Sequence, residues 1–90
     1  MSRRALVTGV VGGIGAAIAR RLAAEGHSVA VTDLPGAALD ARADELGLPA
    51  LPCDLGDAQA VSTMLEALEA AHGAPEIVVS AAGGVCGQTG

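Results

Sequence analysis

A glycine-rich stretch near the amino terminus carries the clearest chemical signal in this sequence. Residues 5–22 read ALVTGVVGGIGAAIARRL, with four glycines in seven positions between an apolar run and an alanine-rich one. A glycine loop before a helix binds anions, because the first N–H groups of the helix lack partners within it and the helix dipole favours negative charge. Missing Cβ atoms let a pyrophosphate approach the backbone. We expect Gly9 to form the tight turn, Gly13 to give close approach and Gly15 to let the helix pack on the sheet.

Residues beyond the glycines indicate which class of phosphate-containing ligand the loop binds. A mononucleotide P-loop needs a Lys after its last glycine, and this sequence contains no Lys. The spacing GxGxxG is also absent, because residue 11 is Val. Asp33 lies 24 residues after Gly9, close to the separation at which a carboxylate binds the adenosine ribose of a dinucleotide. The pattern therefore predicts a dinucleotide as the small-molecule partner.

Apolar periodicity predicts strands and helices in alternation. The strands are expected at Arg4–Gly9, Ser28–Asp33, Leu48–Asp54 and Glu76–Ala81, and the helices at Gly13–Glu25, Ala37–Leu46 and Asp57–His72. The apolar face of the first helix is expected to consist of Ile14, Ala17, Ile18 and Leu22.

Three local features refine these elements. Pro49 and Pro52 favour a sheet edge for the third predicted strand. Asp57 is expected to cap the helix that follows it. The fourth predicted strand is uniformly apolar, which is typical of a strand covered on both faces. Strands that alternate with helices pair in parallel through right-handed crossovers.

The predicted fold class is α/β, a Rossmann-type doubly wound parallel sheet. The order βαβαβαβ supplies only its first half, with four parallel strands in the order 3-2-1-4. We expect residues 1–90 to form the N-terminal dinucleotide-binding half of one domain.

Composition excludes several classes of partner. The net charge of −5 disfavours nucleic acid, and no apolar run approaches the roughly 20 residues of a membrane span. The first residues do not resemble a secretory signal. Cys53 and Cys86 have neither metal-ligand spacing nor the density of a disulfide scaffold, so we predict no metal site and a reducing, cytoplasmic location.

The octet TGVVGGIG at residues 8–15 resembles the TGxxxGxG fingerprint of the short-chain dehydrogenases/reductases. The resemblance covers essentially the whole sequence, including VTDL at 31–34, CDLGD at 53–57 and HGAPEIVVSAAGG at 72–84. The octet also fits TGxxGxxG, the spacing of the extended, epimerase-like branch of the family. The helix at 57–72 and the segment after it look more like the compact dehydrogenase branch, which we favour.

The resemblance implies a set of cofactor-binding residues. Asp33 would accept hydrogen bonds from the ribose hydroxyls, and Asp54 would accept one from the adenine amino group. The whole set is Gly9, Gly12, Gly13, Ile14, Gly15, Asp33, Leu34, Asp54, Leu55, Ala81, Ala82 and Gly83. The family usually has Asn-Asn-Ala-Gly where this sequence has Ser80, Ala81, Ala82 and Gly83, so the first two positions depart from it.

The cofactor is expected to be NAD rather than NADP. A 2′-phosphate would bring about −1.5 to −2 charge against Asp33. Leu34 offers no cation to offset it, and Gly12 stands where NADP-preferring members of the family often place a basic residue.

The resemblance implies an NAD(P)-dependent oxidoreductase that transfers hydride between a nicotinamide and a carbonyl/alcohol substrate. Its members use Tyr as general acid/base, Lys to lower the Tyr pKa and Ser to orient the substrate. This sequence contains no Tyr and no Lys, so we assign no catalytic residue and expect the 90-residue chain alone to be inactive. The family often forms homo-oligomers through later helices.

Two hypotheses follow. The chain is either the leading part of a longer dehydrogenase or a complete, non-catalytic dinucleotide-binding module. We favour the first, because a sheet that ends at the fourth predicted strand would expose an apolar edge.

Overall fold

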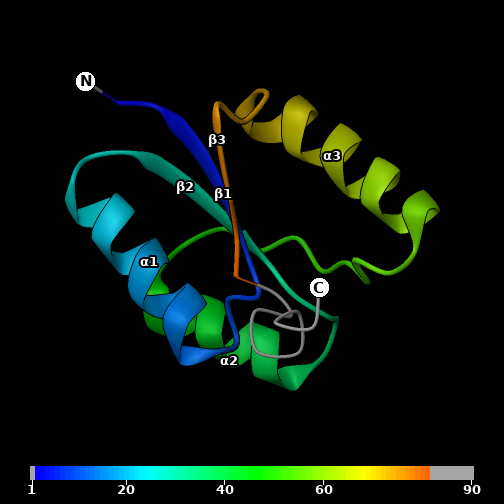
Figure 1. The fold of residues 1–90 in the computed structure, drawn as a ribbon, viewed down its shortest axis with the longest axis horizontal. Helices are drawn as coiled ribbons and strands as arrows, with labels where there is room; N and C mark the ends of the chain where they lie inside the picture. Colours follow the sequence, from blue (N-terminus) through cyan, green and yellow to red (C-terminus); the bar gives the residue numbers. More distant parts are fainter. Residues whose placement is uncertain (1, 82–90) are drawn as a thin grey trace.

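The computed structural model describes residues 2–81 as a parallel sheet with helices on both sides (Figure 1). The predictions on Ala82, Gly83 and Cys86 lie outside the described residues. The elements in chain order are β1 (Arg4–Thr8), α1 (Gly13–Ala24), β2 (Ser28–Thr32), α2 (Ala37–Leu46), α3 (Ala58–His72) and β3 (Ile77–Ser80). Each agrees with a predicted element to within one residue at either end.

The sheet has the order β2-β1-β3, and both pairings are parallel. Successive side chains on a strand point to opposite faces, so each strand supplies two layers of the core. On one face Val7 and Val31 pack with Ala19 of α1 and Leu39 of α2. On the other face, Leu6 and Ala30 pack with α3 through the side chains Met64 and Leu68. The three strands and the two helical layers confirm the α/β class.

The segment Leu48–Asp54 is not a strand, which corrects the predicted count of four. It runs beside β2 and forms one parallel bridge, between Val31 and Ala50. The Val31 N–H donates to the Pro49 carbonyl and the Leu51 N–H donates to the Val31 carbonyl, both at 2.9 Å. A proline has no N–H to donate, so the ladder cannot extend backward from Pro49. The segment still occupies the outer place in the predicted order.

Helix α1 buries only part of the face that periodicity predicts. Ile18 and Leu22 are half-buried and pack against the core, whereas Ile14 is 69% exposed. The fully buried residues of the helix are Gly15, Ala16 and Ala19. Small side chains let the helix axis lie close to β1 and β2, and this close approach determines which side faces the sheet. The large apolar residue in the first turn is therefore left on the surface.

Strand β3 is also less covered than predicted. Its residues alternate between half-buried and exposed, and Val78 is 60% exposed. Val78 pairs with Leu6 and so faces the side of the sheet on which α3 lies, but α3 packs over β1, β2 and the segment beyond them. Among residues 2–81 nothing covers that face of β3.

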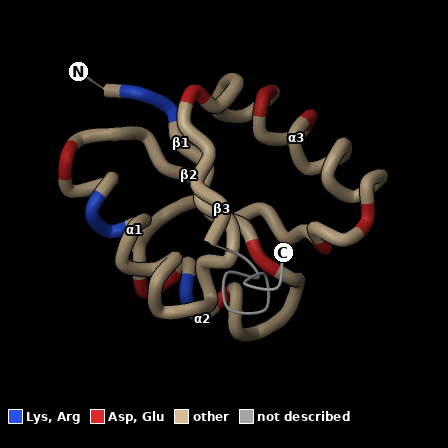
Figure 2. The backbone as a smooth tube through the Cα atoms, viewed as in Figure 1, with Lys and Arg blue, Asp and Glu red and all other residues tan. Residues whose placement is uncertain are grey.

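Helix α3 begins as predicted, because Asp57 caps it. The Asp57 carboxylate accepts hydrogen bonds from the N–H groups of Gln59 at 3.0 Å and Ala60 at 3.4 Å. Figure 2 shows acidic positions and no basic Lys or Arg position along this helix. None of the helices in the described part of the chain is long and apolar enough to span a membrane.

Candidate functional site

The glycine loop joins the carboxyl end of β1 to the amino end of α1. Gly9 takes a φ of +71°, a conformation that favours glycine, and its N–H donates to the Thr32 carbonyl at 3.0 Å. The Gly12 N–H then donates to the Gly9 carbonyl at 3.2 Å, which closes the loop. Gly12 is the N-cap of α1 and has no side chain to cap the helix. The first N–H groups of α1 are thus left for an external anion.

Gly13 and Gly15 differ in how much space surrounds them. A Cβ built on Gly15 would lie 2.3 Å from the Gly9 carbonyl oxygen, so only glycine fits there. A Cβ built on Gly13 would meet no protein atom within 4 Å. Gly15 therefore does make a close approach, but against the backbone of the loop at Gly9 and Val10 and not, as predicted, against the sheet. At Gly13 the space is open, and the predicted close approach of a ligand stays a prediction.

Asp33 lies directly after β2 and reaches back to the glycine loop. Its Oδ2 atom accepts a hydrogen bond from the Val11 N–H at 2.9 Å, and its Oδ1 atom accepts one from the Leu34 N–H at 2.7 Å. Each carboxylate oxygen has a further lone pair to accept a bond from a ligand hydroxyl. The sequence separation of Gly9 and Asp33 suggested that they serve one site. In the structure, Asp33 contacts the glycine loop directly, through Val11.

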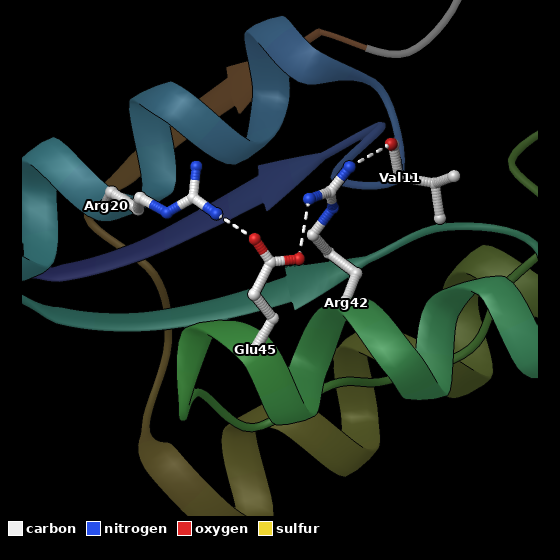
Figure 3. Close-up of polar contacts among 4 residues, drawn as sticks. All are labelled: Val11, Arg20, Arg42 and Glu45. Atoms are coloured by element: carbon white, nitrogen blue, oxygen red, sulfur yellow. Dashed lines mark hydrogen bonds and ion pairs between the residues drawn. The ribbon is translucent and has the colours of Figure 1, made fainter.

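Arg42 of α2 contacts the same loop from the other side, a contact that sequence reasoning missed. Its Nη2 atom donates to the Val11 carbonyl at 2.8 Å, and its Nη1 atom donates to Glu45 at 2.8 Å (Figure 3). Glu45 also binds Arg20 of α1. The spacing of Arg42 and Glu45 on α2 suggests their ion pair. No sequence signal indicates the contact with Val11, which lies 31 positions earlier.

Asp54 lies at the same edge of the sheet but is held only by its own neighbourhood. The Cys53 N–H donates to the Asp33 carbonyl at 2.9 Å, which brings the two segments together. The Asp54 carboxylate accepts a hydrogen bond from the Gly56 N–H at 2.9 Å and is exposed. Burial raises the pKa of the adjacent Cys53 thiol, and the negative charges of Asp54 and Asp57 raise it further.

Three large apolar side chains of the predicted cofactor set are exposed. The exposed fractions are 69% for Ile14, 58% for Leu34 and 36% for Leu55. Each follows the carboxyl end of β1, of β2 or of the segment beside β2, where ligands bind in open α/β sheets. Exposed apolar groups beside polar ones are typical of a surface that a ligand covers.

A row of hydroxyl side chains crosses the sheet at its carboxyl end. Thr8 pairs with Thr32 on one side and with Ser80 on the other. The Thr8 hydroxyl oxygen lies 3.4 Å from the Val79 carbonyl and 3.5 Å from the Ser80 hydroxyl, both long contacts, and its single proton serves one of them at a time. The Thr32 hydroxyl is fully buried and has no hydrogen-bond partner among the described residues. Ala81, a member of the predicted cofactor set, donates its N–H to the Thr8 carbonyl at 3.3 Å.

A cavity of about 470 Å³ lies elsewhere, between residues 50–52 and α3. Its lining includes Met64 and Ala67 but none of the predicted cofactor residues. Within residues 2–81 no group of three His, Cys, Asp or Glu side chains is placed to hold a metal ion.

A parallel sheet with a glycine loop after its first strand and a carboxylate after its second defines the Rossmann-type α/β class. The family model described as enoyl-(acyl carrier protein) reductase matches residues 9–89. The chain belongs to the short-chain dehydrogenase/reductase family.

Named relatives agree with this assignment. The chain is 46% identical over 83 residues to the 3-oxoacyl-acyl-carrier-protein reductase MabA of Mycobacterium bovis, covering 92% of this chain and 31% of that protein. It is 41% identical over 95 residues to the (3R)-3-hydroxyacyl-CoA dehydrogenase of Mus musculus, covering 91% of this chain and 37% of that protein. The chain thus spans about a third of the length of these relatives.

A solved structure with the same fold is that of a variant of actinorhodin polyketide ketoreductase with NADPH. It superposes with a TM-score of 0.83 at 31% sequence identity, covering 88% of this chain and 32% of the ketoreductase. The agreement supports the Rossmann-type fold seen here.

Proposed function

We propose that this chain is the NAD-binding half of a short-chain oxidoreductase that transfers hydride between a nicotinamide and a carbonyl/alcohol substrate. The observation that carries the proposal is the glycine loop, whose Val11 N–H is held by the carboxylate of Asp33. In this arrangement a pyrophosphate lies against Gly12 and Gly13 at the amino end of α1, and the adenosine ribose lies beside Asp33.

The remaining predicted residues complete the cofactor surface. Ile14, Leu34 and Leu55 are exposed apolar groups that the bound cofactor covers. Asp54 accepts a hydrogen bond from the adenine amino group. Ala81, with Ala82 and Gly83 after it, lies beside the ribose on the nicotinamide side.

The preference for NAD rests on charge. A 2′-phosphate on the ribose would approach the carboxylate of Asp33, and Leu34 next to it supplies no cation. Two like unit charges about 4 Å apart repel by roughly 1–4 kcal/mol between bulk water and a protein surface. Arg42 contacts the loop, but its guanidinium already has Glu45 as counter-charge. The structurally similar ketoreductase was solved with NADPH. The NAD preference proposed here is therefore not argued from that similarity but from the charge of Asp33 in this chain.

The catalytic groups of the enzyme would lie outside these 90 residues, which contain no Tyr and no Lys. The names of the relatives describe 3-oxoacyl and 3-hydroxyacyl compounds, which are a carbonyl/alcohol pair. We propose the same class of reaction for the whole protein, in the cytoplasm and as a homo-oligomer. The compact branch of the family is favoured over the extended, epimerase-like branch.

A direct titration tests the proposal. The protein at its full natural length is titrated with NADH and with NADPH, and binding is followed by calorimetry. We expect NADH to bind at least about tenfold more tightly than NADPH, the ratio that 1.4 kcal/mol of repulsion produces. Equal affinities would contradict the NAD preference, and no binding of either would contradict the dinucleotide site.

The second candidate is a non-catalytic dinucleotide-binding module. The absence of Tyr and Lys from the chain is the observation that favours it. The intact mass of the native gene product separates the two. A mass far above 8.7 kDa, with a Tyr-x-x-x-Lys motif in the added sequence, would support the enzyme, and a mass of 8.7 kDa would support the module.

A further inference from the structure

Val11 is held at both of its backbone polar atoms by side chains from distant parts of the chain, one on each of the two peptide groups that flank its Cα. Its N–H donates to Asp33, which follows β2, at 2.9 Å. Its carbonyl accepts a hydrogen bond from Arg42, in α2, at 2.8 Å (Figure 3). Val11 lies between the turn at Gly9 and the N-cap at Gly12, so these two bonds fix the middle of the glycine loop.

Arg42 is itself held in position by contacts within the chain. One nitrogen of its guanidinium binds Glu45, while the other binds Val11, and Glu45 is bound in turn by Arg20. The Arg42 side chain is 24% exposed, against 78% for Arg21, which pairs only with its helical neighbour Glu25. The planar fork of Arg can make two such bonds at once, whereas a Lys ammonium acts as a single point charge.

We propose that Arg42 is a positioning residue for dinucleotide binding, acting through the peptide group that joins Val11 to Gly12. This inference rests on the proposed function. The carbonyl of this peptide group binds Arg42 and its N–H, that of Gly12, binds the Gly9 carbonyl, so the peptide group has one orientation. The backbone of Gly12 and Gly13 is thereby presented to the pyrophosphate without further ordering. Fixing a loop in its binding conformation raises affinity because the cost of ordering is removed.

Asp33 holds the neighbouring peptide group of the same loop. It accepts the Val11 N–H, which belongs to the peptide group before Val11, while Arg42 binds the carbonyl of the peptide group after it. Loss of the Arg42 bond frees the second peptide group and leaves Asp33 to hold the first. Arg42 therefore acts on the phosphate-binding backbone without touching the cofactor.

The test compares three variants of the full-length protein: Arg42→Met, Arg42→Lys and, as a control with the same change of charge, Arg21→Met. We expect Arg42→Met to weaken NADH binding about tenfold, the loss that one charged hydrogen bond of this kind produces. Arg42→Lys should retain part of the affinity, because it keeps the charge but not the fork. Arg21→Met should bind within about twofold of the parent.

A second measurement is made without cofactor, by hydrogen exchange of individual backbone amides. In Arg42→Met the Gly12 amide, which shares a peptide group with the Val11 carbonyl, should exchange faster, and the Val11 amide beside it to a smaller extent, while amides in the middle of β1 and β2 keep their protection. A variant that is destabilised throughout would instead lose protection in the strands. If Arg42→Met fails to fold, Arg42→Lys carries both measurements.

The outcomes separate the two proposals. Absence of NADH binding by the parent protein would contradict the proposed function, whatever the Gly12 and Val11 amides do. Normal binding by the parent with unchanged affinity in Arg42→Met would overturn the positioning role alone. A loss of the same size in Arg21→Met would also overturn it, because the effect would then come from net charge.

Discussion

Asp33 and Asp54 follow neighbouring extended segments at one edge of the sheet, yet their carboxylates are engaged differently. Asp33 is half-buried and accepts the N–H of Val11, 22 positions away. Asp54 is exposed and accepts the N–H of Gly56, two positions away. The first carboxylate joins two elements of the fold, and the second only shapes its own turn.

The difference shows which part of the proposed cofactor site the fold builds in advance. Around Asp33 the loop is fixed by Arg42 from α2 and by the close packing of Gly15 on Gly9. Around Asp54 the backbone is tied to Asp33 through Cys53, but the Asp54 side chain bonds only within its own turn among residues 2–81. The phosphate and ribose end of the proposed site is therefore the more firmly held, and we expect the adenine end to be adjusted on binding.

The largest effect is expected at Gly15. The substitution Gly15→Ala places a Cβ 2.3 Å from the Gly9 carbonyl oxygen, and the backbone around it must move. We expect the free energy of unfolding to fall by at least about 2 kcal/mol, within the range for overpacked cores. Chemical denaturation measures it. An unchanged denaturation midpoint would show that the loop beside Asp33 is less rigid than we propose.

Gly13→Ala is the matched control for Gly15→Ala. Its Cβ meets no protein atom, and Ala favours a helix over Gly by about 0.8–1 kcal/mol, so stability should be kept or raised. NADH affinity should fall at the same time, because the Cβ occupies the space proposed for the pyrophosphate. Unchanged affinity would contradict that placement.

The next largest effect concerns the two aspartates themselves. Asp33→Asn removes the negative charge that holds Val11 and that we propose binds the ribose, and we expect NADH to bind about 10–100-fold more weakly, as 1.5–3 kcal/mol implies. The preference over NADPH should shrink as well, because the repulsion of a 2′-phosphate is gone. Asp54→Asn should cost less than about fivefold, since an exposed, locally bonded group contributes less. Calorimetric titration compares the two variants. Equal losses of NADH affinity would contradict the proposed difference between Asp33 and Asp54.

A smaller effect is expected at the cap of α3, on the Asp54 side. Asp57→Ala leaves the N–H groups of Gln59 and Ala60 without their acceptor, which should lower the unfolding free energy by about 1 kcal/mol. Asp57→Asn keeps an acceptor and should stay within about 0.5 kcal/mol of the parent. Thermal melts test both, and NADH affinity should be unchanged. A loss of stability in the Asn variant as large as in the Ala variant would argue against capping.

The smallest effect is a pH dependence at Cys53. Burial, helped by Asp54 and Asp57, raises the pKa of the Cys53 thiol above its ordinary value of 9.0. The folded protein then keeps this proton to higher pH than the unfolded chain. Its contribution to stability is complete below pH 9.0 and is lost as pH rises toward the folded pKa.

Cys53→Ala removes this titration and provides its control. The unfolding free energy of the parent should fall above pH 9.0 with a slope below about 1.4 kcal/mol per pH unit, and the variant should lose that component. The measurement is a series of denaturant titrations between pH 8 and pH 10 (about one unit on either side). Parallel curves for the two proteins would contradict the raised pKa.

The sequence predicted the elements well where local rules decide them. Asp57 caps α3 with its side chain, as predicted. Helix α2 ends at the predicted Leu46, and the next residue, Gly47, has a φ of +68°. The segment Leu48–Asp54 was overpredicted, because its apolar residues suit a strand but Pro49 cannot donate to a ladder. The exposure of Ile14 was missed because the close approach of α1 depends on small residues and not on the apolar periodicity.

The sequence indicated which residues belong to the candidate site better than it indicated which hydrogen bonds join them. The separation of Gly9 and Asp33 indicated that they belong together, since parallel strands bring their carboxyl ends to one edge. The bonds of Val11 to Asp33 and to Arg42 could not be predicted, because they use backbone atoms that every residue has. Such contacts depend on how α2 lies on the sheet, and the residue types alone do not indicate them.

The most direct test of the central claim is a crystal structure of the full-length protein with NAD bound. We expect the ribose hydroxyls within hydrogen-bond distance of the Asp33 carboxylate, with the pyrophosphate against the backbone of Gly12 and Gly13. We also expect the Val11 N–H to keep its bond to Asp33 and the Val11 carbonyl to keep its bond to Arg42. A dinucleotide bound elsewhere, or one whose ribose lies away from Asp33, would contradict the proposed site.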